Sequence, residues 1–342
     1  MQYGGNQVMF GKMMNRFYYG KAGKGDFTKE DLPETRMQLF WEMLRVRFTG
    51  LFRVNLLYVL AWIPAIIVIG RGVLMGYNGL LALSEMQTQV DAGTATVEAL
   101  NEMNIEMMGY LKAVLTQTLV LLIPALSITG PFTAGLCYVT RNWARDEHSF
   151  VLSDFWQAVK ENWKQALPTS IITSLIPMMV YVCYTFYGDM AGSNVFFLVP
   201  QALSIVVCVL WLCSLMYIYP QMVTYEMNYK TLIRNSFIMA ISCLPMTVGL
   251  KLLSIVPALI CGVIAFLTPY AVYAMLANAA YYILLGFALS RFVGASFTNG
   301  VFDRMLNARI EGAQVNRGLY NEEDEEEEEQ AEQAEQSEST EA

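Results

Sequence analysis

The side chains of this sequence that could do chemistry inside a membrane are few, and the first pair interrupts an apolar run. Residues 127–138 read SITGPFTAGLCY and place Gly130 and Pro131 where a membrane helix should continue. Proline removes a backbone donor and clashes with the preceding turn, which costs about 3 kcal/mol inside a helix. The pair indicates either a broken helix that lines a substrate site or a kink that only packs. We expect the kink, because transporters typically carry paired breaks.

A cation at position 251 is the second candidate. Lys251 lies about six residues after Pro245 in an apolar run, roughly 9 Å along a helix at the usual rise per residue. The lysine stem can carry its ammonium group back over that distance to the membrane interface. We expect this snorkelling, and a buried anion-binding or ion-pairing role is the alternative.

Three further residues are candidates for interactions near the membrane surface. Trp156 lies in SDFWQAVKENW, where aromatic residues at helical spacing beside lysines predict an interfacial amphipathic helix. Asn162 and Asn235 each follow a basic residue and precede an apolar run that proline interrupts, and Asn55 does the same in the first such run. These junctions suggest three helical hairpins in parallel orientation, either from an internal triplication or by chance similarity.

The sequence lacks the common catalytic and metal-binding patterns. It contains no G-x-x-x-x-G-K-[ST], G-x-S-x-G or H-E-x-x-H motif, and it has a single histidine, His148. Its six cysteines lie in apolar stretches without a C-x-x-C pair, which is typical of packing residues. We therefore predict no catalytic residues, no cofactor, no metal site and no nucleic-acid partner, and we do not expect an enzyme.

Composition and apolar runs indicate a membrane protein. Of 342 residues, 55% are hydrophobic and 15% charged, against about 25% charged in an ordinary soluble domain. Six apolar runs are long enough to cross a hydrocarbon core of about 30 Å as helices. They span residues 51–70, 111–139, 165–187, 195–219, 245–267 and 269–292. The expected fold class is an all-α polytopic membrane protein with six transmembrane helices and cytoplasmic amphipathic interfacial helices.

Charged residues set the orientation and the domain boundaries. Lysine and arginine concentrate before the first crossing, in loop 140–164 and after the sixth, whereas residues 72–110 hold none and carry five acids. By the positive-inside rule both termini are cytoplasmic and 72–110 is an acidic extracellular insertion. We expect a cytoplasmic N-terminal segment with an interfacial helix over 1–50, a membrane domain over 51–310 and a disordered acidic tail over 311–342.

Several separated strings resemble the bacterial YesL-like membrane family. Residues 130–166 fit a Gly-Pro-x-x-A-x-L-x-Y-x-x-R helix end, a charged loop and an aromatic F-W-x-A-x-K-x-N-x-x-x-A helix. The fitting residues are Gly130, Pro131, Ala134, Leu136, Tyr138, Arg141, Phe155, Trp156, Ala158, Lys160, Asn162 and Ala166. A second signature is similar at Tyr219, Pro220, Arg234, Asn235, Ser236 and Phe237, and residues 296–306 also look familial. The insertion 72–110 and the acidic tail depart from the usual form.

The resemblance implies a location and a broad role, without a chemistry. The family has no assigned biochemical activity, and its members look like companions of carbohydrate-uptake systems in Gram-positive bacteria. It implies a multi-pass protein of the bacterial plasma membrane, with the lipid bilayer and sugar ABC-transporter or sensory membrane components as partners. A non-enzymatic accessory protein is the expected function. The alternative is a small-molecule transporter, for a sugar or sugar acid, that uses the interrupted second helix.

The topology can be tested with reporter fusions or cysteine labelling at Asp91 and Glu322. We expect labels at the two positions to react from opposite sides of the membrane, because every loop carries the same charge bias. Labelling of both positions from one side would show that the predicted orientation is wrong.

Overall fold

The computed structural model describes residues 33–310 and 312–320, and over these ranges it consists of helices and turns without strands. Residues 321–342 of the predicted disordered tail and residues 1–32 of the predicted N-terminal segment lie outside the described residues. The described chain falls into two units. In the smaller unit, which includes residues 33–39 and 318–320, the Tyr320 amide donates to the Pro33 carbonyl at 2.9 Å. The larger unit spans residues 40–317 and holds the candidate site.

Six helical segments in the described part of the chain are long and apolar enough to cross a membrane. They are α2 (Arg36–Asp91), α3 (Val97–Ser127), α5 (Val151–Ala191), α6 (Leu198–Thr224) preceded by η2 (Val195–Phe197), α8 (Leu244–Leu267), and a sixth segment built from α9 (Ala271–Tyr281), η3 (Tyr282–Gly286), α10 (Phe287–Met305) and η4 (Asn307–Arg309). This confirms the predicted all-α class with six membrane-spanning helices.

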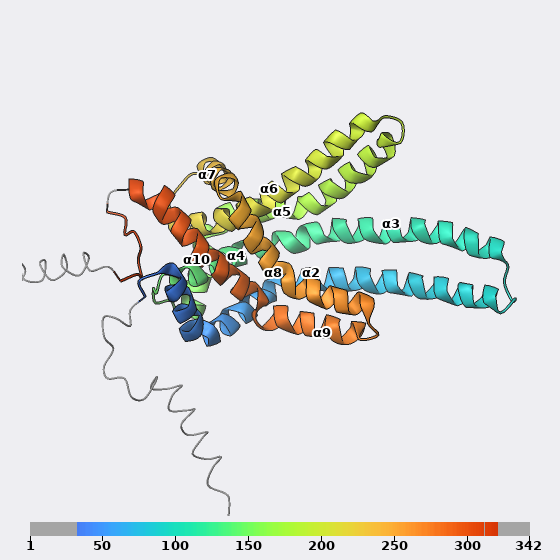
Figure 1. Cartoon of the computed structure of the whole chain (residues 1–342), viewed down its shortest axis with the longest axis horizontal. Coiled ribbons are helices and arrows are strands. Elements are labelled where there is room, and N and C mark those ends of the chain that lie inside the picture. Colours follow the sequence, from blue (N-terminus) through green and yellow to red (C-terminus); the bar gives the residue numbers. More distant parts are fainter. Residues whose placement is uncertain (1–32, 311, 321–342) are drawn as a thin grey trace, which may run out of the picture. The chain divides into compact units, whose positions relative to one another are not determined.

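The crossings are arranged as helical hairpins. Figure 1 shows three antiparallel pairs, α2 with α3, α5 with α6 and α8 with α9, whose connecting turns all lie toward the same side of the picture. This arrangement agrees with the predicted parallel hairpins. Two shorter helices, α4 (Thr129–Trp143) and α7 (Tyr229–Ser242), connect one hairpin to the next along the chain.

The first hairpin is much longer than a membrane requires. Helix α2 has 56 residues, which is about 84 Å of helix, against a hydrocarbon core of about 30 Å. The predicted insertion 72–110 is therefore the helical continuation of both crossings. Two glycines of α2 let α3 approach: a Cβ at Gly72 would lie 2.5 Å from Thr118 Oγ1, and one at Gly79 would lie 2.9 Å from Met107 Sδ. Gly93, with φ +71°, provides the left-handed turn between the helices.

The predicted second crossing, 111–139, is two helices. Helix α3 ends at Ser127 and α4 begins at Thr129, with Ile128 between them. Eleven of the fifteen residues of α4 are buried, and this short helix contacts α5, α6 and α10. Helix α4 also meets α2, because Gly50 of α2 lies against the Trp143 ring. Most of α4 therefore belongs to the protein interior: the membrane-spanning helix ends at Ser127, so the predicted end of the second crossing at residue 139 was wrong.

The sixth segment is interrupted by a π-helix whose backbone is bound by the first crossing. Asn55 of α2 is fully buried, and its Nδ2 donates to the carbonyls of Tyr282 and Ile283 at 2.9 and 2.7 Å. Its Oδ1 accepts from the Ala288 amide at 2.9 Å. A π-helical turn disrupts the i to i−4 hydrogen-bond pattern, and a membrane offers no water to replace it. Asn55 therefore stabilises the irregular turn.

Replacing Asn55 should destabilise the protein strongly. Asn55→Ala removes three hydrogen bonds and leaves buried backbone groups without partners, which costs about 1–3 kcal/mol per group. Asn235→Ala, on the half-buried face of α7, is the matched control and should cost less than about 0.5 kcal/mol. Thermal unfolding in detergent measures both. Equal melting temperatures for the two variants would contradict the role assigned to Asn55.

Candidate functional site

The break before α4 is closed by a hydroxyl group from α5. Pro131 has no amide hydrogen, so it cannot donate to the Ser127 carbonyl four residues earlier. Ser170 Oγ donates to this carbonyl instead, at 2.5 Å. The Ser127 hydroxyl also lies 3.0 Å from the hydroxyl oxygen of Ser174, which is on α5 with Ser170. The carbonyl that proline frees is thus satisfied within the protein, as a membrane interior demands.

Two glycines bring α4 against α5. A Cβ at Gly130 would lie 2.6 Å from Ser170 Cβ and would also clash with the Ala166 carbonyl. A Cβ at Gly135 would lie 2.8 Å from the Phe155 carbonyl. We call the group Ser127, Gly130, Pro131, Ala166 and Ser170 the α4–α5 joint. Because α5 fills the space beside Gly130, the joint is a packed contact between helices.

The other predicted interaction residues lie on separate helices. Trp156 of α5 is 39% exposed and makes an edge-to-face contact with Phe132, the neighbour of Pro131, at 5.6 Å between ring centres. Asn162 Nδ2 donates to the Ala158 carbonyl of its own helix at 2.9 Å. Asn235 is half-buried on α7. The structure therefore brings Trp156 close to the first turn of α4, where Gly130 and Pro131 lie. Asn162 and Asn235 are half-buried, unlike Asn55, which is fully buried.

Lys251 has a neighbour that sequence reasoning missed. It is half-buried on α8, and Arg291 of α10 is close enough for the two positive charges to repel each other. The Arg291 guanidinium carbon lies 5.4 Å from the centre of the Tyr219 ring on α6. The signal for Arg291 was its position one residue before the end of the predicted sixth crossing, where it resembled an ordinary boundary residue.

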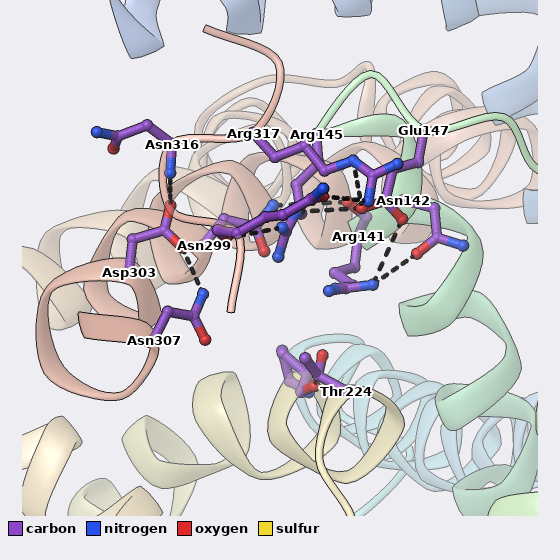
Figure 2. A network of polar contacts seen from close by, with 12 residues as sticks. Arg141, Asn142, Arg145, Glu147, Thr224, Asn299, Asp303, Asn307, Asn316 and Arg317 are labelled. Carbon is purple, nitrogen blue, oxygen red and sulfur yellow. Dashed lines mark hydrogen bonds and ion pairs between the residues drawn. The ribbon is translucent and has the colours of Figure 1, made fainter. Parts of the chain in front are cut away.

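A polar network at the far end of α4 was also missed (Figure 2). The Glu147 carboxylate is shared by three guanidinium groups, those of Arg141, Arg145 and Arg317, at 3.6, 3.3 and 3.4 Å. The Glu147 amide donates to the Asn142 carbonyl at 2.9 Å, which fixes the turn after α4. We call these residues the Glu147 network. The string RNWARDEH holds most of it, but charges in a loop usually face solvent.

A second set of polar contacts lies nearby and joins α10 to the residue after α6; Figure 2 shows its members Asp303, Asn307 and Asn316. The Tyr225 hydroxyl, just after α6, donates to Asn307 Oδ1 at 2.7 Å, and Asn307 Nδ2 donates to Asp303 Oδ1 at 2.5 Å. The Asn316 amide donates to Asp303 Oδ2 at 3.2 Å. These contacts hold the segment after α10 against the helix ends.

Burial shifts the pKa values of two residues in these two sets of contacts. Burial lowers the pKa of Arg141 from its usual value, and repulsion by Arg145 adds to the effect. Burial raises the pKa of Tyr225 to about 12, so its hydroxyl keeps its proton and remains a donor at neutral pH. With three guanidinium groups around one carboxylate, the chemistry available here is electrostatic and positional. In the described residues, no group of three or more His, Cys, Asp and Glu side chains could hold a metal ion.

The joint can be tested with two glycine variants. Gly130→Ala should destabilise the protein by about 1–3 kcal/mol, because the new methyl group overpacks against α5. The matched control is Gly249→Ala on α8, where a Cβ would meet no atom within 4 Å. That variant should stabilise the helix by up to about 1 kcal/mol. The free energy of unfolding is measured for both variants. A Gly130→Ala variant as stable as Gly249→Ala would show that α4 and α5 are not in close contact at Gly130.

Comparison with known protein families gives a match to part of the chain. A model of the family described as "Protein of unknown function, DUF624" matches residues 110–184, about a fifth of the chain. Neither the curated proteins nor the solved structures contain a match to this sequence. The matched segment runs from α3 through α4 into α5, so the chain is similar to this family over the α4–α5 joint and the first part of the Glu147 network.

Proposed function

We propose that this protein is a non-enzymatic integral membrane protein that acts as an accessory or interaction component beside a transport or sensory complex. The observation that carries the proposal is the packed α4–α5 joint. The Gly130–Pro131 break was the sequence feature that best suggested a substrate site, and α5 occupies the space beside it. Because the break serves helix packing, it favours an accessory role for the protein over a role as a transporter whose substrate passes at Gly130 and Pro131.

Exposed aromatic and apolar side chains support the interaction role. The first turns of α5 carry Phe150, Leu152, Trp156 and Trp163, all between 39% and 67% exposed. They follow the Glu147 network in the chain, on the side predicted to be cytoplasmic. Tryptophan is favoured both at membrane interfaces and in protein–protein contacts, where single residues can dominate affinity. A rigid network beside exposed aromatic residues suits a docking function.

The finer assignment rests on the sequence resemblance. The YesL-like signatures suggest that the partner belongs to carbohydrate uptake in a Gram-positive bacterium, as a permease, an ATPase or a sensory membrane protein. The family match over residues 110–184 supports the resemblance at its most specific string. The proposed location is the bacterial plasma membrane with both termini cytoplasmic.

A transporter of a sugar or sugar acid is the second candidate. The observation that favours it is Lys251, a half-buried cation inside a membrane-spanning helix. Intramembrane cations of this kind commonly mark substrate or ion paths.

Partner isolation tests the accessory role. The full chain, tagged and extracted from its native membrane in mild detergent, should copurify with a stoichiometric permease or ATPase subunit. Trp163→Ala should reduce recovery of that subunit without changing the melting temperature, because Trp163 is 48% exposed. Tyr184→Ala is the matched control: it removes an aromatic side chain that is 53% exposed, farther along the same helix, and should leave recovery unchanged.

A ligand panel completes the test. A sugar or sugar acid bound at about 100 times its Kd would stabilise the protein by about 2.7 kcal/mol, which a melting curve detects. We expect no such shift. Stabilisation that disappears in a folded Pro131→Ala variant, without a stoichiometric partner, would replace the accessory role with transport.

A further inference from the structure

Two basic side chains in the membrane-spanning part of the protein lack a counter-charge. Lys251 on α8 and Arg291 on α10 are both half-buried, and both lie in segments able to cross a membrane. Over residues 33–310 and 312–320, neither side chain forms an ion pair or a hydrogen bond with another residue. Charged groups in this setting are costly, and they usually pair with a partner or bind a ligand.

The three helices that carry Tyr219, Lys251 and Arg291 offer no acid close to the pair. Helices α6, α8 and α10 contact one another, and α4, α6, α8 and α9 contain no Asp or Glu at all. The acid of α10 is Asp303, twelve residues beyond Arg291 and about 18 Å along the helix. Asp303 accepts hydrogen bonds from Asn307 and Asn316 in the polar contacts of Figure 2. Arg291 therefore repels Lys251, and neither cation forms an ion pair with an acid in the described residues.

Tyr219 orients one of the two cations. The guanidinium carbon of Arg291 lies 5.4 Å from the centre of the buried Tyr219 ring. A cation–π contact of this kind fixes the guanidinium plane, but it leaves the positive charge and the N–H donors available to an anion. Snorkelling would account for the position of Lys251 alone. It does not account for Arg291, which contacts the Tyr219 ring and is close enough to repel Lys251.

We propose that Lys251 and Arg291 bind a single phosphate group, supplied by an anionic lipid headgroup or by a small soluble phosphate ester. Arginine offers a planar fork of donors that matches phosphate oxygens, and lysine adds a compact point charge. Lys251 lies seven residues after Leu244, the first residue of α8, which is about 10 Å of helix. The lysine side chain can extend back along α8 toward the membrane surface at which the helix begins, where it could contact a lipid phosphate. This site goes beyond the proposed accessory role and does not depend on it.

The test uses the purified full-length protein in detergent. Its melting temperature is followed during titration with short-chain phosphatidylglycerol, with glycerol 3-phosphate and with short-chain phosphatidylcholine. We expect stabilisation by phosphatidylglycerol that exceeds the effect of phosphatidylcholine. A response to phosphatidylglycerol alone identifies a lipid as the source of the phosphate group, whereas a response to glycerol 3-phosphate as well identifies a soluble ester.

Two variants and one control connect the response to the site. Lys251→Met and Arg291→Met should each weaken binding by about tenfold, the effect of losing a charge-assisted contact. Without ligand, Lys251→Met should melt at a higher temperature than the unmodified protein, because one of two repelling charges is gone. Lys230→Met, at an exposed lysine on α7, should change neither quantity.

Two results would overturn the proposal. One is the absence of stabilisation by either phosphate ligand beyond that of phosphatidylcholine. The other is an equal response in the unmodified protein and in both methionine variants, since a snorkelling lysine would give that result. Because Arg291→Met also removes the contact with Tyr219, Lys251→Met provides the decisive comparison if the arginine variant folds poorly.

Discussion

The close approach of α4 to α5 is the constraint on which the larger unit depends. A freed carbonyl in a bilayer cannot turn to water, so the break made by Pro131 needs a donor from the protein itself. Ser170 can provide that donor because Gly130 has no side chain to hold the helices apart. Once α4 is fixed on α5, its remaining faces are free to receive α6 and α10. A short buried helix thus becomes the element to which the longer crossings attach.

Basic side chains meet two different environments in this structure. In the Glu147 network, three guanidinium groups share one carboxylate, so part of the cost of burying them is offset by the pairing. In the described residues, Lys251 and Arg291 have no carboxylate partner, and we propose that a bound anion offsets the cost of their position. The first environment fixes the helix ends in position. In the second, the two unpaired cations destabilise the folded protein, and binding of an anion would remove part of that unfavourable free energy.

The sequence was a good guide to the helices and a poor guide to their contacts. Long apolar runs and sparse charge predicted six crossings, because a membrane permits few other structures. The Gly130–Pro131 break was also visible, but its partner Ser170 lies 43 positions from Ser127. Hydroxyl groups are common in apolar runs, so no local pattern distinguishes the one that donates across the break.

The same limitation explains the missed residues of the candidate site. Asn55 and Asn235 look alike at their helix junctions, yet only Asn55 faces a π-helix, a feature that no periodicity announced. Arg291 was missed because it lies one residue before the end of the predicted sixth crossing, where basic residues are common, and its contact with Tyr219 of α6 is not visible in the sequence. Glu147 depends on Arg317, far away in sequence. Contacts between distant segments decide all three cases, and a single sequence does not display them.

The bond between Asn55 and the π-helix also has a consequence for biosynthesis. Asn55 belongs to the crossing formed by α2, whereas its partners Tyr282 and Ile283 follow 227 and 228 residues later. At about 5–20 residues per second, the ribosome needs roughly 10–50 seconds to reach them. Throughout that interval the first helix carries a polar amide with no final partner. Membrane insertion of this chain therefore requires a temporary host for Asn55, such as water in the insertion machinery or the membrane interface, before the last crossing can replace it.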